Sequence, residues 1–315
     1  MQDFIKINKD DNVAVALKPI AKGTTVNVAG TDVTTLEDVP QGHKFAIKPI
    51  KKGDAVIKYG FRIGYAQADV EVGGWIHTHN LRTALGELLD YTYNPEGHKD
   101  VEPTDEAYFE GYMRENGKVG VRNEVWIIPT VGCVNSIARA IEATARLNKP
   151  EGEDEVVPLT HPYGCSQTTE DQENTRTVLA DLINHPNAGA VLVLGLGCEN
   201  SRIEVLKNYI GEVNPDRVKF LQVQDVEDEQ EVAAEIMEEL MNYAAAFKRE
   251  KVSAKELVIG MKCGGSDGLS GITANPTVGL FSDMLVSKGG TTILTEVPEM
   301  FGAETILMDR CANRE

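Results

Sequence analysis

The segment GGWIHTHN, residues 73–80, places His77 and His79 one residue apart in a chain that has only 6 histidines. Side chains two positions apart on an extended strand point to the same side, so both imidazoles are expected to reach one point. Asn80 and Arg82 follow closely and add an amide and a fixed cation. Imidazole suits iron, zinc or nickel, and oxygen ligands extend the choice to manganese. The pattern predicts a divalent-metal site suited to an α-hydroxycarboxylate, with a polar exposed edge as the alternative.

Four of the five cysteines, Cys133, Cys165, Cys198 and Cys263, come directly after apolar runs that are predicted to be strands. Ligands of open parallel sheets bind outside the carboxyl ends of the strands. We therefore predict a functional edge at which these thiols ligate a metal or line a pocket. For any single cysteine, a small buried residue is the alternative interpretation. The sequence contains no CxxC, so neither a zinc ribbon nor a ferredoxin-type pattern is indicated.

The loop CGGSDGLSG, residues 263–271, places Ser266 and Asp267 between glycines. Backbone N–H groups in such a loop can turn toward an anion. The loop lacks the GK[ST] ending of a Walker motif. We interpret it as a functional loop, with a flexible connection as the alternative.

The elements that must position these residues alternate along the chain. Continuous apolar runs that fit buried parallel strands occupy residues 124–133, 155–165, 188–198 and 256–265, and VKFLQVQDV and TTILTEV supply two more. Helical stretches lie between them at residues 135–148, with Asn135 as the N-cap, and at 175–185, 201–211 and 227–250. The alternation predicts an α/β body with a mainly parallel sheet.

The first ninety residues contain a repeat, since KPIAKGTTV at 18–26 returns as KPIKKGDAV at 48–56. Each copy carries a Lys-Gly turn before a β-branched run, which indicates two similar β-rich halves. Residues 91–110 are polar, acidic and contain prolines, as is typical of a linker. We therefore predict a β-rich domain at 1–90, a linker at 91–110 and an α/β body at 111–315.

Composition limits the partners. The 315 residues carry a net charge of −18, which argues against non-specific binding to nucleic acid or to an anionic membrane. The amino terminus lacks the pattern of a signal peptide, and the most apolar segment, 188–197, is too short to cross a bilayer. An odd number of cysteines in such a chain favours thiols over disulfides. A cytoplasmic protein with a small-molecule partner is expected, and assembly into a homo-oligomer is left open.

Several long blocks resemble the altronate and galactarate dehydratase family, and most closely its altronate branch. They are GYMRENGKVGVRNEVWIIPTVGCVN, THPYGCSQ, HPNAGAVLVLGLGCEN, CGGSDGLSGITANP and VIKYGFRIGYAQADVEVGGWIHTHN. The resemblance runs along the whole chain and implies an amino-terminal SAF (β-clip) domain before the α/β body. It also implies hexuronate catabolism, in which D-altronate is dehydrated to 2-keto-3-deoxy-D-gluconate with a divalent metal, Fe²⁺ or alternatively Mn²⁺. Family members continue beyond the point that matches residue 315, so the resemblance predicts an incomplete α/β body.

Dehydration of an aldonate requires a base for the C2 proton, a cation for the carboxylate and an acid for the departing hydroxyl. With this resemblance, the metal is expected at His77 and His79, and the substrate at Asn80 and Arg82. Two residues of the second block, Arg122 and Asn123, are further candidates for substrate binding. The predicted catalytic residues are Ser266, Asp267, Cys165, Cys198 and Cys263, with Cys133 lining the same edge.

Three other functions remain open. A galactarate dehydratase performs the same chemistry on another sugar acid. A C–S lyase similar to sulfolactate sulfo-lyase also eliminates a group β to a carboxylate, but there the β-rich module and the α/β body are separate chains. Their fusion here favours the sugar-acid enzyme. A non-catalytic fragment that binds sugar acids would form no keto acid, so turnover distinguishes it.

Overall fold

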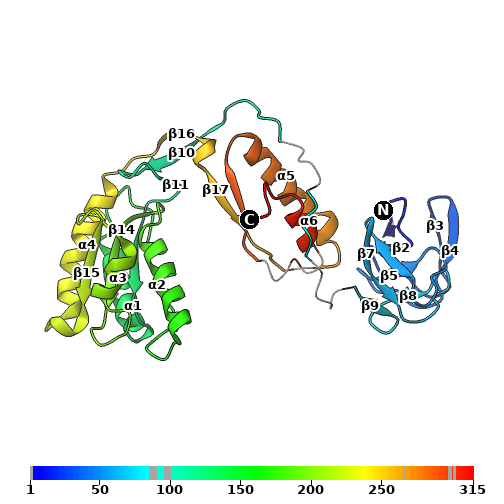
Figure 1. Cartoon of the computed structure of the whole chain (residues 1–315), viewed down its shortest axis with the longest axis horizontal. Helices are drawn as coiled ribbons and strands as arrows, with labels where there is room; N and C mark the ends of the chain where they lie inside the picture. Colours follow the sequence, from blue (N-terminus) through cyan, green and yellow to red (C-terminus); the bar gives the residue numbers. More distant parts are fainter. Residues whose placement is uncertain (1–2, 85–90, 96–100, 266, 297–299, 301–302) are drawn as a thin grey trace. The chain divides into compact units, whose positions relative to one another are not determined.

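The computed structural model describes residues 3–84, 91–95, 101–265, 267–296, 300 and 303–315. The chain forms two compact units, which are described separately (Figure 1). One unit contains 1–104, 258–287 and 291–315, and the other contains 105–257 and 288–290. Within this division the segments after residue 257 are grouped mainly with the amino-terminal residues, whereas the sequence analysis assigns them to the α/β body.

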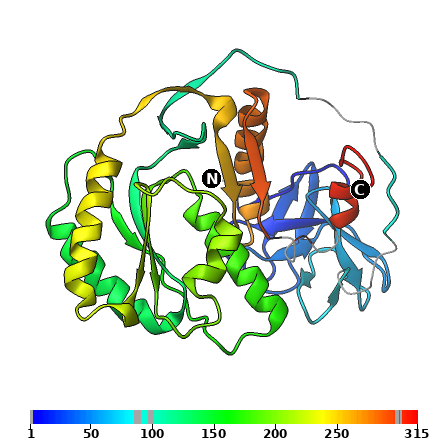
Figure 2. The same ribbon diagram turned by 60° about the vertical axis from the view of Figure 1, so that its left-hand side comes forward.

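The second unit is built around a four-stranded parallel sheet with helices on both faces (Figure 2). The strand order is β13 (Val156–Pro158), β12 (Glu124–Pro129), β14 (Ala188–Gly195) and β15 (Val218–Gln222). The helices are α1 (Asn135–Leu147), α2 (Thr169–Ile183), α3 (Ile203–Ile210) and α4 (Glu229–Ala245). Every residue of β12 and β14 is buried, which explains why these strands have continuous apolar sequences.

Alternate residues of the central strands enter two separate cores. Val125 and Ile127 of β12 pack in the core formed with α1 and α4. Trp126 and Ile128, the residues between and after them, pack in the core formed with α2 and α3. The two-residue period of a strand thus produces a three-layer structure from one apolar run.

The connections reverse direction at the centre of this sheet. From β12 the chain crosses through α1 to β13 on one side, and from β13 it crosses through α2 to β14 on the other side of β12. This doubly wound topology has its switch point between β12 and β14, where ligands of such sheets bind. A small antiparallel sheet of β11 (Val119–Gly120), β10 (Tyr108–Met113) and β16 (Glu250–Ser253) completes the unit.

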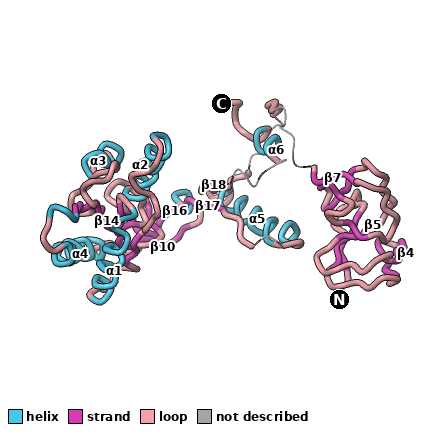
Figure 3. The backbone as a smooth tube through the Cα atoms, turned by 90° about the horizontal axis from the view of Figure 1, so that it is seen from below, coloured by secondary structure: helices cyan, strands magenta, loops and turns pink. Residues whose placement is uncertain are grey.

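The amino-terminal part of the first unit consists of strands and loops, as Figure 3 shows. Its largest sheet has the order β1 (Phe4–Ile5), β2 (Val13–Ala16), β5 (Lys44–Ala46) and β8 (Trp75–Ile76). Beside it are the hairpin β3 (Thr25–Val28) with β4 (Thr31–Thr34) and the sheet β6 (Ala55–Lys58), β7 (Phe61–Ala66) and β9 (Leu81–Thr83).

The sequence repeat of the amino-terminal part has a structural counterpart. Ile20 of the first copy forms an isolated bridge to Val39, and Ile50 of the second copy forms one to Val70. Gly23 and Gly53 follow at matching positions with φ of +80° and +90°, a conformation that favours glycine. The prediction of two similar β-rich halves is consistent with these matching contacts.

The remaining strands form a separate parallel pair, β17 (Val258–Met261) with β18 (Thr291–Leu294), connected through η4 (Ser270–Ile272) and α5 (Ala274–Ser287). The short helix α6 (Glu304–Met308) follows. The prediction of an α/β architecture with parallel strands is confirmed, but the expectation that these strands join one sheet is wrong. Large apolar side chains remain exposed here, including Leu280 at 62%, Met284 at 59% and Leu294 at 53%.

The predicted N-cap role of Asn135 is also wrong. A 3-10 turn, η1 (Gly132–Val134), precedes α1, so Val134 occupies the N-cap position without a side-chain cap. The Asn135 side chain instead donates from Nδ2 to the carbonyl of His161 at 2.8 Å. Across the described ranges, the structure contains no helix long and apolar enough to span a membrane.

Candidate functional site

The switch point of the parallel sheet lies between two loops. Residues 130–134 leave β12 toward α1, and residues 196–202 leave β14 toward α3, on the opposite face. Pro129 and Leu194 pair across the two strands, and Cys133 and Cys198 each follow their paired residue by four positions. Both thiols are free and exposed. The structure therefore places two of the predicted strand-end cysteines at equivalent positions in the two loops that flank the switch point.

Glu199 links the two loops at the switch point. Its carboxylate accepts hydrogen bonds from Thr130 Oγ1 at 2.6 Å and from the backbone N–H groups of Gly197 at 2.6 Å and Leu196 at 3.1 Å. The residue is only 2% exposed. Burial alone would raise the pKa of Glu199, but the hydrogen bonds outweigh it and lower the pKa below the ordinary value. A charged carboxylate thus fixes the loop that carries Cys198.

The loop after β13 joins the same edge. Tyr163 accepts through its carbonyl from the Gly132 N–H at 2.7 Å, and the Asn200 side chain donates to the Cys165 carbonyl at 3.1 Å. Cys165 is free and exposed. The three loops after β12, β13 and β14 are therefore held together by hydrogen bonds, and we refer to them as the carboxyl edge.

His161 is used in the framework of the carboxyl edge rather than as a free base. Its Nε2 lies 2.9 Å from the Pro129 carbonyl, to which only a protonated nitrogen can donate, and its Nδ1 accepts from the Tyr163 N–H at 3.3 Å. Nearby, Oδ1 of Asn135 is buried without a hydrogen-bond partner among the described residues. Such an unpaired acceptor is unusual in a folded protein and is available to a bound molecule.

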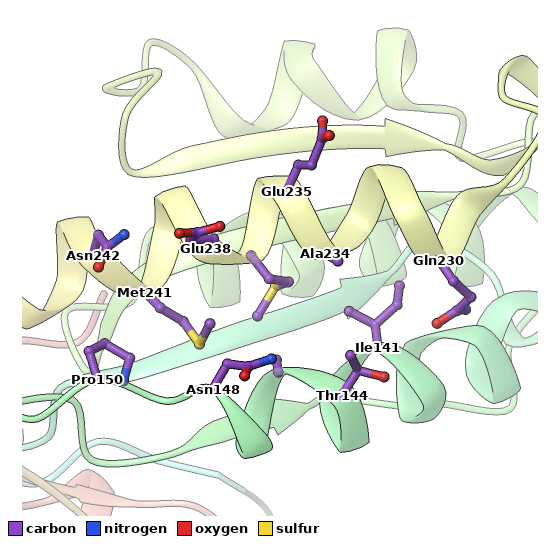
Figure 4. Close-up of a pocket in the computed structure, with 12 residues that line it drawn as sticks. Ile141, Thr144, Asn148, Pro150, Gln230, Ala234, Glu235, Glu238, Met241 and Asn242 are labelled. Carbon is purple, nitrogen blue, oxygen red and sulfur yellow. The ribbon is translucent and has the colours of Figure 1, made fainter.

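A hollow of about 830 Å³ lies between the loop after β13 and α2. Its apolar wall includes Leu159, Val178 and Leu182, and its polar rim includes Gln167 and Asp171. A site of this size and mixed lining fits a small polar molecule. A second hollow, of about 460 Å³, lies between α1 and α4 (Figure 4). That groove is lined by helix residues and by Asn148 and Pro150, and it contains none of the predicted site residues.

The histidine segment is not the strand that the sequence suggests. β8 ends at Ile76, and residues 77–80 form a turn that returns the chain to β9. Asn80 closes this turn, since its Oδ1 accepts from the His77 N–H at 3.0 Å and its Nδ2 donates to the Trp75 carbonyl at 2.8 Å. The prediction that strand geometry aligns His77 with His79 is therefore wrong. The Asn80 side chain uses its oxygen and its nitrogen in hydrogen bonds within the turn.

The turn nevertheless collects imidazoles around one indole. Trp75 Nε1 donates to His43 Nδ1 at 3.1 Å, and the rings of His43 and His77 stack with centroids 4.8 Å apart. The His79 ring lies 5.0 Å from that of Trp75. Burial, then the neighbouring His77 and Lys44, lower the pKa of His43, so its ring is neutral at pH 7. The sequence analysis missed His43, because nothing local relates it to a turn more than thirty positions later.

A divalent metal does not find a complete ligand set in this histidine turn. Catalytic metal sites commonly use three protein ligands and leave one position open. His43 does not supply the third ligand, since its Nδ1 accepts from Trp75 and its proton is therefore on Nε2. Throughout the part of the chain that the structure describes, no three His, Cys, Asp or Glu side chains are arranged to hold one ion.

Other predicted residues are distributed over the fold. Arg82 is exposed in β9, directly after the histidine turn. Asp267 accepts at Oδ1 from the N–H groups of Leu269 at 2.6 Å and Ser270 at 2.9 Å, and these bonds lower its pKa. Ser266 lies outside the described residues, and Cys263 follows β17 in the other unit from the carboxyl edge.

Arg122 and Asn123 lie at the amino end of β12, away from the carboxyl edge. Asn123 is fully buried, accepts from Arg114 at 2.8 Å and donates to the carbonyls of Gly152 at 3.0 Å and Ala244 at 2.8 Å. Its amide is saturated by the framework. Arg122 pairs with Glu124 at 2.9 Å. The structure therefore does not bring these two predicted substrate-binding residues to the carboxyl edge.

The fold and site define a class: an α/β protein with exposed thiols in the loops at its topological switch point, and a β-rich module with a histidine turn. Residues 2–84 match the altronate/galactarate dehydratase SAF domain. Residues 111–245 match the second domain of D-galactarate dehydratase/altronate hydrolase, and 254–315 match the C-terminal part of D-galactarate/altronate dehydratase. The chain belongs to the altronate/galactarate dehydratase family.

Curated relatives resemble this chain from end to end. It is 50% identical to altronate dehydratase of Bacillus subtilis over 100% of this chain and 64% of that protein. It is 51% identical to altronate dehydratase of Escherichia coli over 98% of this chain and 63% of that protein. It is 34% identical to the Escherichia coli galactarate dehydratase (L-threo-forming), over 99% of this chain and 62% of that protein. The chain thus spans somewhat less than two thirds of the length of these relatives.

Proposed function

We propose that this chain forms the larger part of a hydro-lyase that converts D-altronate to 2-keto-3-deoxy-D-gluconate and water. The observation that carries the proposal is the sequence identity, 50% and 51%, with two altronate dehydratases over 100% and 98% of this chain. The lower identity with the galactarate enzyme favours altronate over galactarate as the substrate. The free thiols of Cys133, Cys165, Cys198 and Cys311 are consistent with a reducing, cytoplasmic setting in hexuronate catabolism.

The proposed reaction moves two protons and breaks one C–O bond. A base takes the C2 proton, the C3 hydroxyl leaves with a proton as water, and the resulting enol becomes the 2-keto acid. His77 and His79 are the candidate bases, since a neutral imidazole nitrogen can accept a proton. Arg82, which follows them in β9, is the candidate partner of the substrate carboxylate.

His43 has a defined place in this proposal. Its neutral ring accepts from Trp75 at Nδ1, so the proton on Nε2 is available to donate to a bound oxygen. Its stacking on His77 holds both rings in place. We assign His43 the position of a hydrogen-bond donor and leave proton abstraction to His77 and His79.

Dependence on a divalent metal, Fe²⁺ or Mn²⁺, remains part of the proposal. When bound, such an ion would stabilise negative charge on the carboxylate and 2-hydroxyl, an effect worth several kcal/mol. A ring that binds the ion cannot also take the C2 proton. One of His77 and His79 would therefore bind the ion while the other acts as the base, and a complete ligand set requires further groups.

The proposal is tested by product analysis. The protein is purified without oxygen, supplied with ferrous iron and incubated with altronate, galactarate or sulfolactate. Each assay is run alone and with a polypeptide corresponding to the part of the Bacillus subtilis relative that this chain does not match. We expect keto acid from altronate in preference to galactarate, and no sulfite from sulfolactate. Binding of altronate without any keto acid would instead support a sugar-acid-binding protein.

A further inference from the structure

Two hairpins of the β-rich module contain a left-handed residue that is not glycine. Among the described residues, Ala29 has φ of +50° and Tyr59 has φ of +59°, and each is followed by a glycine that also has a positive φ. Two-residue hairpin loops with this backbone strongly prefer Asn-Gly, and a bulky residue with positive φ is a genuine outlier. Such strain persists only where the surrounding structure favours it, so the contacts of Tyr59 indicate what the strain supports.

The two positions correspond in the sequence repeat. Ala29 and Tyr59 are separated by 30 positions, as are the repeat copies at 18–26 and 48–56. Ala29 lies between β3 and β4, and Tyr59 lies between β6 and β7. The first copy forms its hairpin with a small side chain, so the hairpin itself does not need an aromatic ring. The difference indicates that the tyrosine side chain acts outside the hairpin.

The Tyr59 side chain contacts a short segment that is distant in the sequence, residues 267–271. Its hydroxyl donates to the Gly268 carbonyl at 3.2 Å. Its ring lies beside Gly271, where a built Cβ would be 3.7 Å from Tyr59 Cε2. The Lys58 ammonium lies 4.4 Å from the centre of the same ring and adds a cation–π contact. One side chain thus contacts residues 267–271 at two points.

The same segment lies against the backbone that leads to His43. A Cβ built on Gly268 would lie 2.9 Å from the Gly42 carbonyl oxygen, an approach that favours glycine. Gly42 directly precedes His43, whose ring stacks on that of His77 with centroids 4.8 Å apart. Asp267 directly precedes Gly268. Asp267 and the stacked imidazoles therefore lie on the two sides of one backbone contact.

Electrostatics are consistent with this arrangement. Burial, then the carboxylates of Asp11 and Asp267, raise the pKa of the Tyr59 phenol, so its hydroxyl keeps the proton that it donates. Asp11 Oδ1 accepts from the Gly60 N–H at 2.7 Å and so fixes the hairpin. The hydrogen bonds that Asp267 accepts from described residues are all at Oδ1, which leaves Oδ2 able to accept from a bound hydroxyl.

We propose that Tyr59 is a positioning residue that holds residues 267–271 against the β-rich module, so that Asp267 and the histidine turn contact the same sugar acid. The inference rests on the proposed function, because altronate is the ligand that it names. Asp267 accepts a hydrogen bond from a hydroxyl of the sugar chain, while the imidazoles contact the reacting end. The strained backbone at Tyr59 is retained because it assembles this site from two distant segments.

Hydrogen exchange of the full chain, followed by mass spectrometry, tests the anchoring without any ligand. Tyr59→Asn supplies the residue that the hairpin prefers and removes the contacts with 267–271. The melting temperature should therefore not fall, while the amides of 267–271 should exchange at least about fivefold faster, as expected for the loss of one hydrogen bond. Tyr59→Phe, which removes only the hydroxyl, should also accelerate this exchange. Ala29→Asn, the matched change in the other hairpin, should leave it unchanged.

Unchanged exchange of 267–271 in both Tyr59 variants, or equal acceleration in Ala29→Asn, would overturn the anchoring role. Altronate should slow exchange of both 77–80 and 267–271 in the wild-type protein, but only of 77–80 in Tyr59→Asn. Protection of 77–80 alone in the wild-type protein would overturn the shared site. Protection of neither segment would contradict altronate binding itself, while the exchange rates without ligand would still decide whether Tyr59 anchors the segment.

Discussion

Two buried glutamates of the second unit are stabilised in opposite charge states. Glu199 is surrounded by hydrogen-bond donors, which lower its pKa. Both oxygens of Glu153 are buried without a partner among the described residues, and burial raises its pKa to about 7. The nearby Lys149 ammonium opposes this rise, but it donates to the backbone carbonyls of Glu153 and Asp154. The two residues therefore predict opposite responses of stability to pH.

The Glu199→Gln variant should lower the free energy of unfolding by about 2 kcal/mol at pH 7, since the amide replaces charge-assisted acceptors with one neutral oxygen. A lowered pKa contributes stability above the unfolded value, near 4.5, which is lost as the pH falls through the folded value. The difference from wild type should thus shrink below pH 4.5. Urea unfolding at several pH values measures it, with the exposed Glu204→Gln as the matched control. A pH-independent difference would contradict the assignment.

Glu153→Gln should have the opposite effect. A raised pKa gives stability that is complete below about 4.5 and is lost as the pH rises through about 7. The neutral amide avoids this loss, so the variant should be more stable than wild type at pH 8, by about 3 kcal/mol at most, and similar to it at pH 4. Thermal unfolding across this range, with the exposed Glu151→Gln as the control, tests the expectation. Equal stability of variant and wild type at pH 8 would show that ionisation of Glu153 does not destabilise the folded protein.

Among the elements, the turns of the β-rich module depend on glycine to different degrees. Gly73 has φ of +89°, and a Cβ built on it lies 1.9 Å from the Thr34 carbonyl oxygen. Gly53 has φ of +90°, but a Cβ there meets nothing within 4 Å. Alanine at Gly53 would therefore meet only the cost of the left-handed backbone, whereas alanine at Gly73 would also collide with the Thr34 carbonyl.

Gly53→Ala should lower the free energy of unfolding by about 1–2 kcal/mol, which is the cost of a left-handed alanine. Gly73→Ala adds a backbone clash and should cost about 3 kcal/mol or more in total. Chemical denaturation followed by the fluorescence of Trp75, which lies in the same module, measures both values. Equal losses in the two variants would mean that the contact between Gly73 and Thr34 relaxes freely.

Element by element, the sequence predicts the second unit well. Long apolar runs predict β12 and β14, because burial on both faces of a strand produces a continuous apolar sequence. The helical stretch at 227–250 predicts α4. The switch point could not be read from sequence, since the order of parallel strands depends on the packing of distant segments. For the same reason the cysteines were placed at strand ends, while their hydrogen-bonded surroundings became visible only in the fold.

The site in the β-rich module was harder to predict. The spacing of His77 and His79 suggested a strand, but Asn80 closes a turn around the backbone of Trp75 and His77. A side chain that bonds its local backbone can override a β pattern. His43 joins the cluster through a tertiary contact with Trp75, for which the sequence has no local signal.

At the scale of the whole molecule, exposed apolar side chains gather on β17, β18 and α5. In α5 the buried residue is Leu285, whereas Leu280, Phe281 and Met284 are exposed. A two-stranded sheet rarely persists without further strands or a covering layer. The curated altronate dehydratases are longer, with 64% and 63% of their lengths matched by this chain.

We predict that the part of the Bacillus subtilis relative that this chain does not match, supplied as a separate polypeptide, raises altronate dehydration by this chain at least about tenfold. A catalytic site needs a closed, shaped cavity, and a misplaced group costs about 10²-fold even when the other groups remain. Steady-state assays with and without the added polypeptide measure the effect. Equal rates would show that this chain supplies all the groups that the reaction needs.

The central claim is that the chain takes part in dehydration of altronate through an enol. The most direct measurement is mass and NMR analysis of the product formed from altronate in D₂O, with ferrous iron and the complementing polypeptide present. We predict 2-keto-3-deoxygluconate that carries one deuterium at C3, because the enol takes up a deuteron from the solvent at that carbon. Altronate recovered unchanged, or a keto acid without deuterium at C3, would contradict dehydration through an enol.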